Sequence, residues 1–173
     1  MLNKILKSVI GLVLLSFLVF LVLGIPNTQH EMITEIEINA PVEEVYNYVM
    51  DIDNNENWLS GFVSADLIKG EKGAVGSEYK VVFLQKGKPM EMKETITDVV
   101  PNQKIGFDLS DKMIDGHIDI EFKATGSGTQ VKEIHGFHGK SILSRAITKM
   151  FSKAIHKGKQ EMYDDLKKVI EGN

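Results

Sequence analysis

A glutamate and a histidine near the end of the chain are the first candidates for chemistry. Glu133, His135 and Phe137 alternate along one run, so their side chains should share one face of a strand. A Glu and a His placed in this way can act as an acid/base pair or bind a polar group of a ligand. They can also be polar residues at a strand end that reach solvent, and the sequence leaves both readings open.

Glu94 is the second candidate, because alternation places it with the apolar residues Met92 and Ile96. A carboxylate that points inward without a partner has a raised pKa and can anchor a ligand or act as a base. The alternative is a structural carboxylate that bonds to a neighbouring strand or lies at the sheet edge. We assign no catalytic residue on these grounds alone.

Metal and thiol chemistry find little support in the sequence. The chain has no cysteine, which excludes disulfides, thiolate metal sites and a cysteine nucleophile. His135 and His138 are three residues apart on a predicted strand and face opposite sides. Asp115, His117 and Asp119 do share a face, but its charged character favours a row of solvated side chains. We therefore expect no metal ion and no cofactor.

The elements that must position these residues are short alternating runs separated by Gly-rich or polar segments. Seven strands are predicted, at residues 34–38, 62–69, 78–85, 90–99, 104–110, 114–123 and 129–138. Short connections between them predict an antiparallel sheet with one apolar face. A helix is predicted at residues 42–50, and a long amphipathic helix at residues 142–170 that can cover the apolar face.

An apolar run precedes this domain, beginning at Ser8 and ending at Ile25. At about 1.5 Å per residue it spans roughly 27 Å, close to the hydrocarbon thickness of a bilayer. No small-residue cleavage site follows it, which favours a membrane span over a signal peptide. Lys4 and Lys7 precede the run and the next basic residue is Lys69, which predicts a cytoplasmic N-terminus and an extracytoplasmic domain. The anchor is expected at residues 1–27 and the domain at residues 28–173.

Several segments carry a resemblance to a known family. IEINAPVEEVYNYVMDIDNNENWLSGF resembles the opening strand, helix and tryptophan segment of the START-like SRPBCC group of polyketide cyclases/dehydrases and lipid-transport proteins. GAVGSEY, MKETITDVVPNQKIGF and GSGTQVKE are similar to later segments, in the family's order. The resemblance runs from about Ile33 to the end of the chain. It implies an α+β helix-grip fold, in which a curved seven-stranded antiparallel sheet surrounds a long C-terminal helix.

The resemblance also implies a cavity between sheet and helix, in which most members bind apolar or amphipathic molecules and a minority catalyse reactions. The side chains expected to line it are Trp58, Tyr79, Phe83, Met92, Glu94, Phe107, Glu133, His135, Phe137, Met150, Phe151, Ala154, Gly158 and Met162. The methionines suit an adaptable lining, or simply fill a core. The leading function is binding of a hydrophobic or lipid-like small molecule. The alternatives are a cyclase or dehydratase that uses Glu94, Glu133 or His135, and a protein-interaction domain of the cell envelope.

The long helix carries an unusual run of charge. Between residues 140 and 159 six residues are basic and none is acidic: Lys140, Arg145, Lys149, Lys153, Lys157 and Lys159. Lys149, Lys153 and Lys157 follow at steps of four and should share a helix face, where they could contact anionic lipid headgroups. A solvated helix face is the alternative. The net charge of −4 argues against general binding of nucleic acid.

Overall fold

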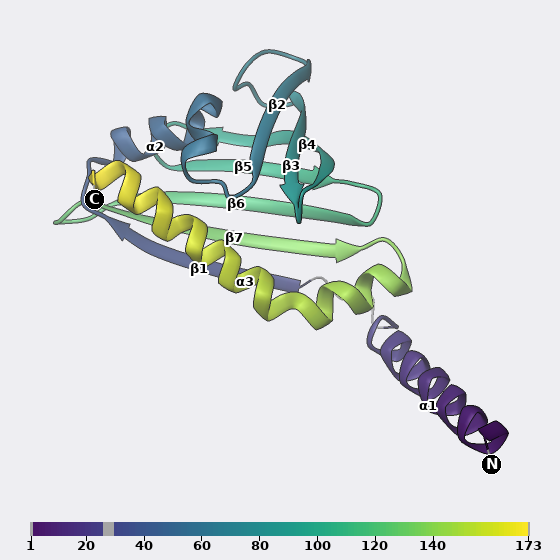
Figure 1. The fold of residues 1–173 in the computed structure, drawn as a ribbon. Helices are drawn as coiled ribbons and strands as arrows, with labels where there is room; N and C mark the ends of the chain where they lie inside the picture. The colour runs from purple at the N-terminus through teal and green to yellow at the C-terminus, as the bar shows by residue number, and fades with distance from the viewer. Residues whose placement is uncertain (1, 26–29, 173) are drawn as a thin grey trace.

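The computed structural model describes residues 2–25 and 30–172, and in them helices flank a run of consecutive strands (Figure 1). The elements in order are α1 (Leu2–Leu23), β1 (His30–Ile38), α2 (Val42–Met50), the 3-10 helix η1 (Ile52–Asn57), β2 (Phe62–Lys69), β3 (Glu78–Gln85), β4 (Lys88–Val100), β5 (Lys104–Ser110), β6 (Ile114–Ala124), β7 (Thr129–Gly139) and α3 (Ile142–Glu171). The predicted elements are confirmed. β2, β3 and β5 have the expected bounds, and β1 begins earlier because it pairs with β7 along its whole length.

The strands form one antiparallel sheet in the order β1-β7-β6-β5-β4-β3-β2. β2 to β7 follow one another as a meander, and β1 pairs with β7 from His30 opposite Phe137 to Ile38 opposite Thr129. The register shifts between Ile96 and Asp98 in β4, and twice in β2. Because such bulges bend and twist a sheet, they curve the β2 to β4 part of it.

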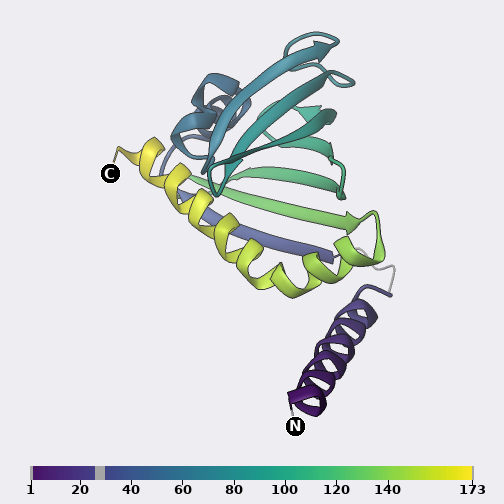
Figure 2. The ribbon, with the colours of Figure 1, turned by 45° about the vertical axis from the view of Figure 1, so that its right-hand side comes forward.

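The long helix α3 lies along one part of the curved sheet. It packs mainly on β1 and β7, while β2, β3 and β4 rise away from it in Figures 1 and 2. This is the helix-grip arrangement that was expected, with a seven-stranded sheet curved about a C-terminal helix. A capping box between Ser141 and Ser144 begins α3, and Gly172 in a left-handed conformation ends it.

The larger of the two clusters of buried apolar residues lies where α2 and the second half of α3 meet the sheet. Tyr46 contacts Phe122 edge-on at a centroid distance of 5.4 Å, and Trp58 lies 5.8 Å from Tyr163. Leu166, also from α3, is fully buried in the same cluster. This cluster closes one end of the space between helix and sheet, so the middle is where a cavity can form.

The first helix projects away from the domain in both ribbon views. Its segment Lys4–Val22 has the length and composition of a membrane span or a signal sequence, and none of it is buried. Gly24 follows the helix and is buried against α3: Arg145 Nε donates a hydrogen bond to the Gly24 carbonyl oxygen at 2.7 Å. A Cβ at Gly24 would overlap the Ile142 carbonyl oxygen, so this close approach requires glycine. The expected boundary at residues 27 and 28 lies outside the described residues.

Candidate functional site

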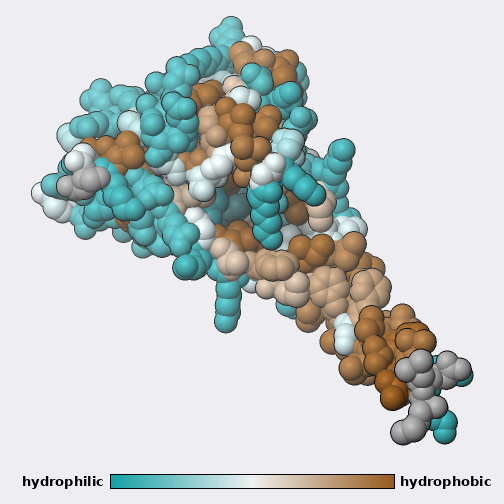
Figure 3. All heavy atoms as spheres, viewed as in Figure 1, coloured by the Kyte–Doolittle hydropathy of each residue, from teal (hydrophilic) through white to brown (hydrophobic). Residues whose placement is uncertain are grey.

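A cavity of about 520 Å³ lies between the sheet and α3. The space-filling view shows this face hollowed above α3, with apolar residues beside the hollow (Figure 3). Its walls come from η1, from strands β3 to β7 and from the middle of α3, and most of the lining side chains are apolar. The alternation of each strand supplies one inward face, so residues far apart in the sequence meet here.

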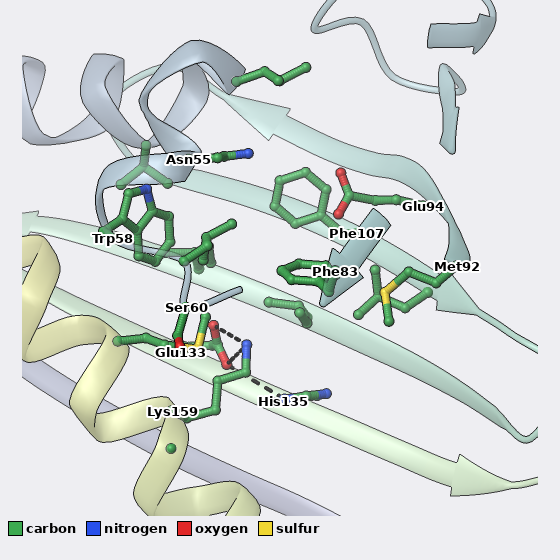
Figure 4. A pocket seen from close by; sticks show the side chains of 18 of the residues that line it. Asn55, Trp58, Ser60, Phe83, Met92, Glu94, Phe107, Glu133, His135 and Lys159 are labelled. Atoms are coloured by element: carbon green, nitrogen blue, oxygen red, sulfur yellow. Dashed lines mark hydrogen bonds and ion pairs between the residues drawn. The ribbon is translucent and has the colours of Figure 1, made fainter. Parts of the chain in front are cut away.

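Most of the predicted lining residues surround this cavity. They are Trp58, Tyr79, Phe83, Met92, Glu94, Phe107, Glu133, His135, Ala154, Gly158 and Met162. Phe83, Phe107 and Met92 form the apolar wall around Glu94, and Trp58 lies at the η1 side (Figure 4). The indole Nε1 of Trp58 is buried and has no hydrogen-bond partner among the described residues.

Three of the predicted residues lie elsewhere. Phe137 is buried, but it packs edge-on against the ring of His135 rather than lining the cavity. Met150 and Phe151 are 54% and 50% exposed, on the first half of α3. The prediction placed lining residues on the long helix from Met150 to Met162, but only those from Ala154 onward line the cavity.

Glu133 is the centre of a buried ionic cluster, so the reading in which it reaches solvent was wrong. The side chain is 3% exposed, and Lys159 Nζ lies 3.1 Å from Oε1 and 3.3 Å from Oε2 (Figure 4). Tyr163 donates a hydrogen bond from its hydroxyl to Oε2 at 2.8 Å. Lys159 and Tyr163 are one helical turn apart, so both reach the same carboxylate. Burial, with the negative charge of Glu133, raises the pKa of Tyr163 well above its ordinary value.

The place of Lys159 in the run of basic residues suggested that it belongs to an outer basic face, but the structure places it inside. Its side chain is 17% exposed and lines the cavity. Neither Lys159 nor Tyr163 was predicted as a site residue. The sequence pattern that could have identified Lys159 as an inward residue is its helical spacing. It shares the side of α3 that faces the sheet with Ile155, Met162 and Leu166.

His135 lies beside this cluster as a neutral ring. Its Nδ1 is 3.7 Å from Glu133 Oε1 and has no hydrogen-bond partner among the described residues. Burial and then the positive charge of Lys159 lower the pKa of His135 to about 4, while Glu133 acts in the opposite direction. Near neutral pH the ring can therefore donate or accept one hydrogen bond to a cavity ligand.

Glu94 faces the same cavity from β4, across from the cluster (Figure 4). Within the described residues, no side chain or backbone group forms a hydrogen bond or ion pair with its carboxyl group. Burial raises the pKa of Glu94 to about 7, against the opposing effect of Lys159. A carboxyl group with this pKa exists in both protonation states near neutral pH, so it can either donate or accept a hydrogen bond.

The cavity is thus an apolar chamber with polar groups on two sides. One side holds the closed cluster of Glu133, Lys159 and Tyr163 with His135 beside it, and the other holds Glu94. Among the described residues, no group of three or more His, Asp or Glu side chains could hold a metal ion. The arrangement suits an apolar ligand that carries one or more neutral polar groups.

The charged row on β6 lies on the outer face of the sheet, as expected. His117 Nδ1 is 2.7 Å from Asp108 and Nε2 is 3.1 Å from Asp119, and the side chain of His117 is 40% exposed. These contacts between a histidine and two carboxylates lie at the surface, apart from the cavity lining.

The comparison with protein families matches residues 29–171 to the family described as polyketide cyclase / dehydrase and lipid transport. Solved structures share the fold. They include Ara h 8.0201 (14% identity, covering 84% of this chain and 100% of that chain, TM-score 0.69). Protein CV1439 from Chromobacterium violaceum is 21% identical over 84% of this chain and 99% of that chain, with a TM-score of 0.66. The di-domain ARO/CYC StfQ from the steffimycin biosynthetic pathway is 12% identical over 84% of this chain and 52% of its own, with a TM-score of 0.68.

No curated protein sequence matches the chain. Because the family match covers almost all of the chain after α1, this chain belongs to the polyketide cyclase / dehydrase and lipid transport family.

Proposed function

We propose that this protein binds a hydrophobic small molecule with a neutral polar group in the cavity between sheet and α3, beside a membrane that α1 enters. The observation that carries the proposal is an apolar cavity of about 520 Å³ into which Glu94 points without a hydrogen-bond or ion-pair partner among the described residues. A carboxyl group in apolar surroundings normally has a hydrogen-bond partner, so this arrangement favours a ligand as the partner.

Small residues on α3 keep the cavity open. Ala154 and Gly158 stand on the side of the helix that lines it, and a Cβ at Gly158 would meet no atom within 4 Å. Protein interiors are usually packed without voids of this size. A protein-interaction domain of the envelope would be expected to have a closed core, so the open space favours the binding proposal.

The electrostatics narrow the class of ligand. Glu133 is already compensated by Lys159 and Tyr163, so this cluster has little remaining capacity for an anionic group. Glu94 and the neutral ring of His135 retain hydrogen-bonding capacity. Hydroxyl or carbonyl groups on an otherwise apolar molecule, such as a lipid or an isoprenoid, satisfy both without placing a charge in the cavity.

The apolar helix α1 supports a proposal for the position of the protein in the cell. We infer that it spans a membrane, with the lysines at positions 4 and 7 on the cytoplasmic side and the domain on the other side. A short connection between Ile25 and His30 holds the domain close to the bilayer, where apolar ligands concentrate.

The single tryptophan makes the binding proposal testable in the full chain. Trp58 lines the cavity and α1 contains no tryptophan, so quenching of its emission reports on the cavity alone. In nanodiscs, a terminally brominated dodecanol should quench Trp58 saturably, and phosphatidylcholine with brominated acyl chains should not. Native mass spectrometry of the same sample should show a bound molecule that is not a nanodisc lipid. Absence of both signals overturns the proposal.

A cyclase or dehydratase is the second candidate, and the observation that favours it is the carboxyl group of Glu94 in the cavity wall, where burial raises its pKa to about 7. A carboxyl group with this pKa is well suited to move a proton at neutral pH, for example from a carbon next to a carbonyl group. Glu94→Gln should then abolish conversion of a bound substrate without abolishing its binding. An unaltered turnover in Glu94→Gln would exclude this role.

A further inference from the structure

The first half of α3 has its polar and apolar residues on unexpected sides. Ser144, Ala146 and Thr148 are buried, with 2%, 0% and 7% exposure. The large apolar side chains of this segment are exposed: Ile142 and Leu143 by 46%, Met150 by 54% and Phe151 by 50%. A helix in water normally has the opposite arrangement, so this surface is suited to an apolar environment.

The buried polar groups need no partner outside the helix. Ser144 takes part in the capping box with Ser141, and the Thr148 hydroxyl donates a hydrogen bond to the Arg145 carbonyl oxygen at 3.0 Å. Their burial therefore costs little, and it leaves the larger apolar side chains on the outside.

Three of the four exposed apolar residues lie on a different arc of the helix from two lysines, while Ile142 lies on the arc of the lysines. At about 100° per residue, Leu143, Met150 and Phe151 lie within one arc. Lys149 and Lys153 lie beside that arc, and neither forms an ion pair with any described residue. Apolar side chains flanked by lysines are typical of helices that lie at the surface of a membrane. Lys157, the third lysine of the predicted face, instead forms an ion pair with Glu161 at 3.1 Å.

The same segment is continuous with α1. Gly24 packs against the backbone of Ile142, and Arg145 binds the Gly24 carbonyl oxygen, so the start of α3 lies at the end of the apolar helix. Figure 3 shows apolar residues extending from α1 onto this part of the domain.

We propose that residues 142–153 of α3 lie in the bilayer interface, with Leu143, Met150 and Phe151 among the acyl chains and Lys149 and Lys153 at anionic headgroups. This inference rests on the proposed anchoring by α1. Ala154 and Gly158, which line the cavity, follow within the next turns of the same helix. The cavity therefore lies next to the lipid surface, and an apolar ligand can pass between them with little exposure to water.

Because the chain has no cysteine, single labels can test the proposal in the full-length protein. Leu143→Cys and Met150→Cys would each carry an NBD fluorophore, with the protein reconstituted in vesicles of phosphatidylcholine and phosphatidylglycerol. Lys123→Cys, at an exposed position on β6, is the matched control. We expect blue-shifted emission at positions 143 and 150, with strong quenching by lipids that carry a nitroxide on the acyl chain. The label at position 123 should show neither effect.

The outcomes separate this proposal from the others. Labels at 143 and 150 that remain in water, in a chain that is embedded through α1, overturn it and leave anchoring and ligand binding untouched. A blue shift that lipid nitroxides do not quench, and that grows with the ratio of protein to lipid, indicates a second protein copy on this surface and also overturns it. A chain that does not enter vesicles at all overturns both this inference and the anchoring by α1, while quenching of Trp58 still tests the cavity.

Discussion

Substitutions at Gly158 provide the sharpest test of the cavity, because one backbone position separates stability from binding. Gly158 lies inside α3, and a Cβ there would meet no atom within 4 Å. Alanine is favoured over glycine in a helix by about 0.8–1.0 kcal/mol. Gly158→Ala should therefore increase the free energy of unfolding by about 1 kcal/mol, which corresponds to roughly 2–4 °C in Tm for a domain of this size.

A larger side chain at the same position should have a different effect. In Gly158→Phe the ring enters the cavity next to Met162 and gains apolar contacts there, so the free energy of unfolding should equal or exceed that of the wild type. The ring also occupies the space that a ligand needs. Binding of the brominated alcohol should be lost in Gly158→Phe and retained in Gly158→Ala.

Both quantities can be measured on the full chain in nanodiscs. Urea unfolding followed by Trp58 emission gives the stability, and quenching of the same residue gives the binding. His156→Phe is the control, since it adds the same ring on an exposed part of α3. A destabilised Gly158→Ala would show that this position is not open. Undiminished binding in Gly158→Phe would show that the ligand lies elsewhere, and either result refutes the reasoning.

Two further predictions concern the buried charges. Lys159→Met removes the cation that faces the buried carboxyl group of Glu133, so the free energy of unfolding should fall by about 3–5 kcal/mol. Adding Glu133→Gln should restore most of this loss. Equal losses in the single and double variants would contradict this account. The second prediction is a pH profile of urea stability. His135, with a pKa lowered to about 4, makes stability fall as the pH drops below about 6.5, because only the unfolded chain takes up the proton there. Glu94, with a pKa raised to about 7, makes stability fall as the pH rises from about 4.5 to 7, because the unfolded chain releases its proton first. The two effects oppose each other, so Glu94→Gln should lose more stability on acidification than the wild type and His135→Phe less, whereas parallel profiles would refute both assignments.

The sheet was predictable because its signal is local. Alternation along each strand marks its buried face and most of its extent, and Tyr79, Phe107 and Ile118 all point to the side that their parity indicated. The resemblance to a family then supplied the arrangement of the strands, which periodicity cannot give. Residues assigned to the cavity from strand parity, such as Met92 and Glu94, lie on its wall.

The side-chain environments along the long helix were harder to predict, because they depend on which element packs beside each turn. Met150 and Phe151 continue the stripe that includes Met162, yet they are exposed on the first half of α3 and do not line the cavity. Lys159 was grouped with exposed lysines because nothing local indicates that Glu133, on another element, is its partner. Long-range ion pairs of this kind become visible only when strand and helix are placed in space.

The cluster of Glu133, Lys159 and Tyr163 also determines which wall of the cavity can yield. It fastens α3 to β7, while among the described residues no hydrogen bond or ion pair joins β4, across the cavity, to the helix. The bulge between Ile96 and Asp98 interrupts the pairing of β4 with β5 on that unfastened side. We therefore expect the two walls to differ in compliance, with β2 to β4 bending more readily than β7 and α3, which the ion pair joins. A cavity of this kind would accept ligands of different width without breaking its buried ion pair.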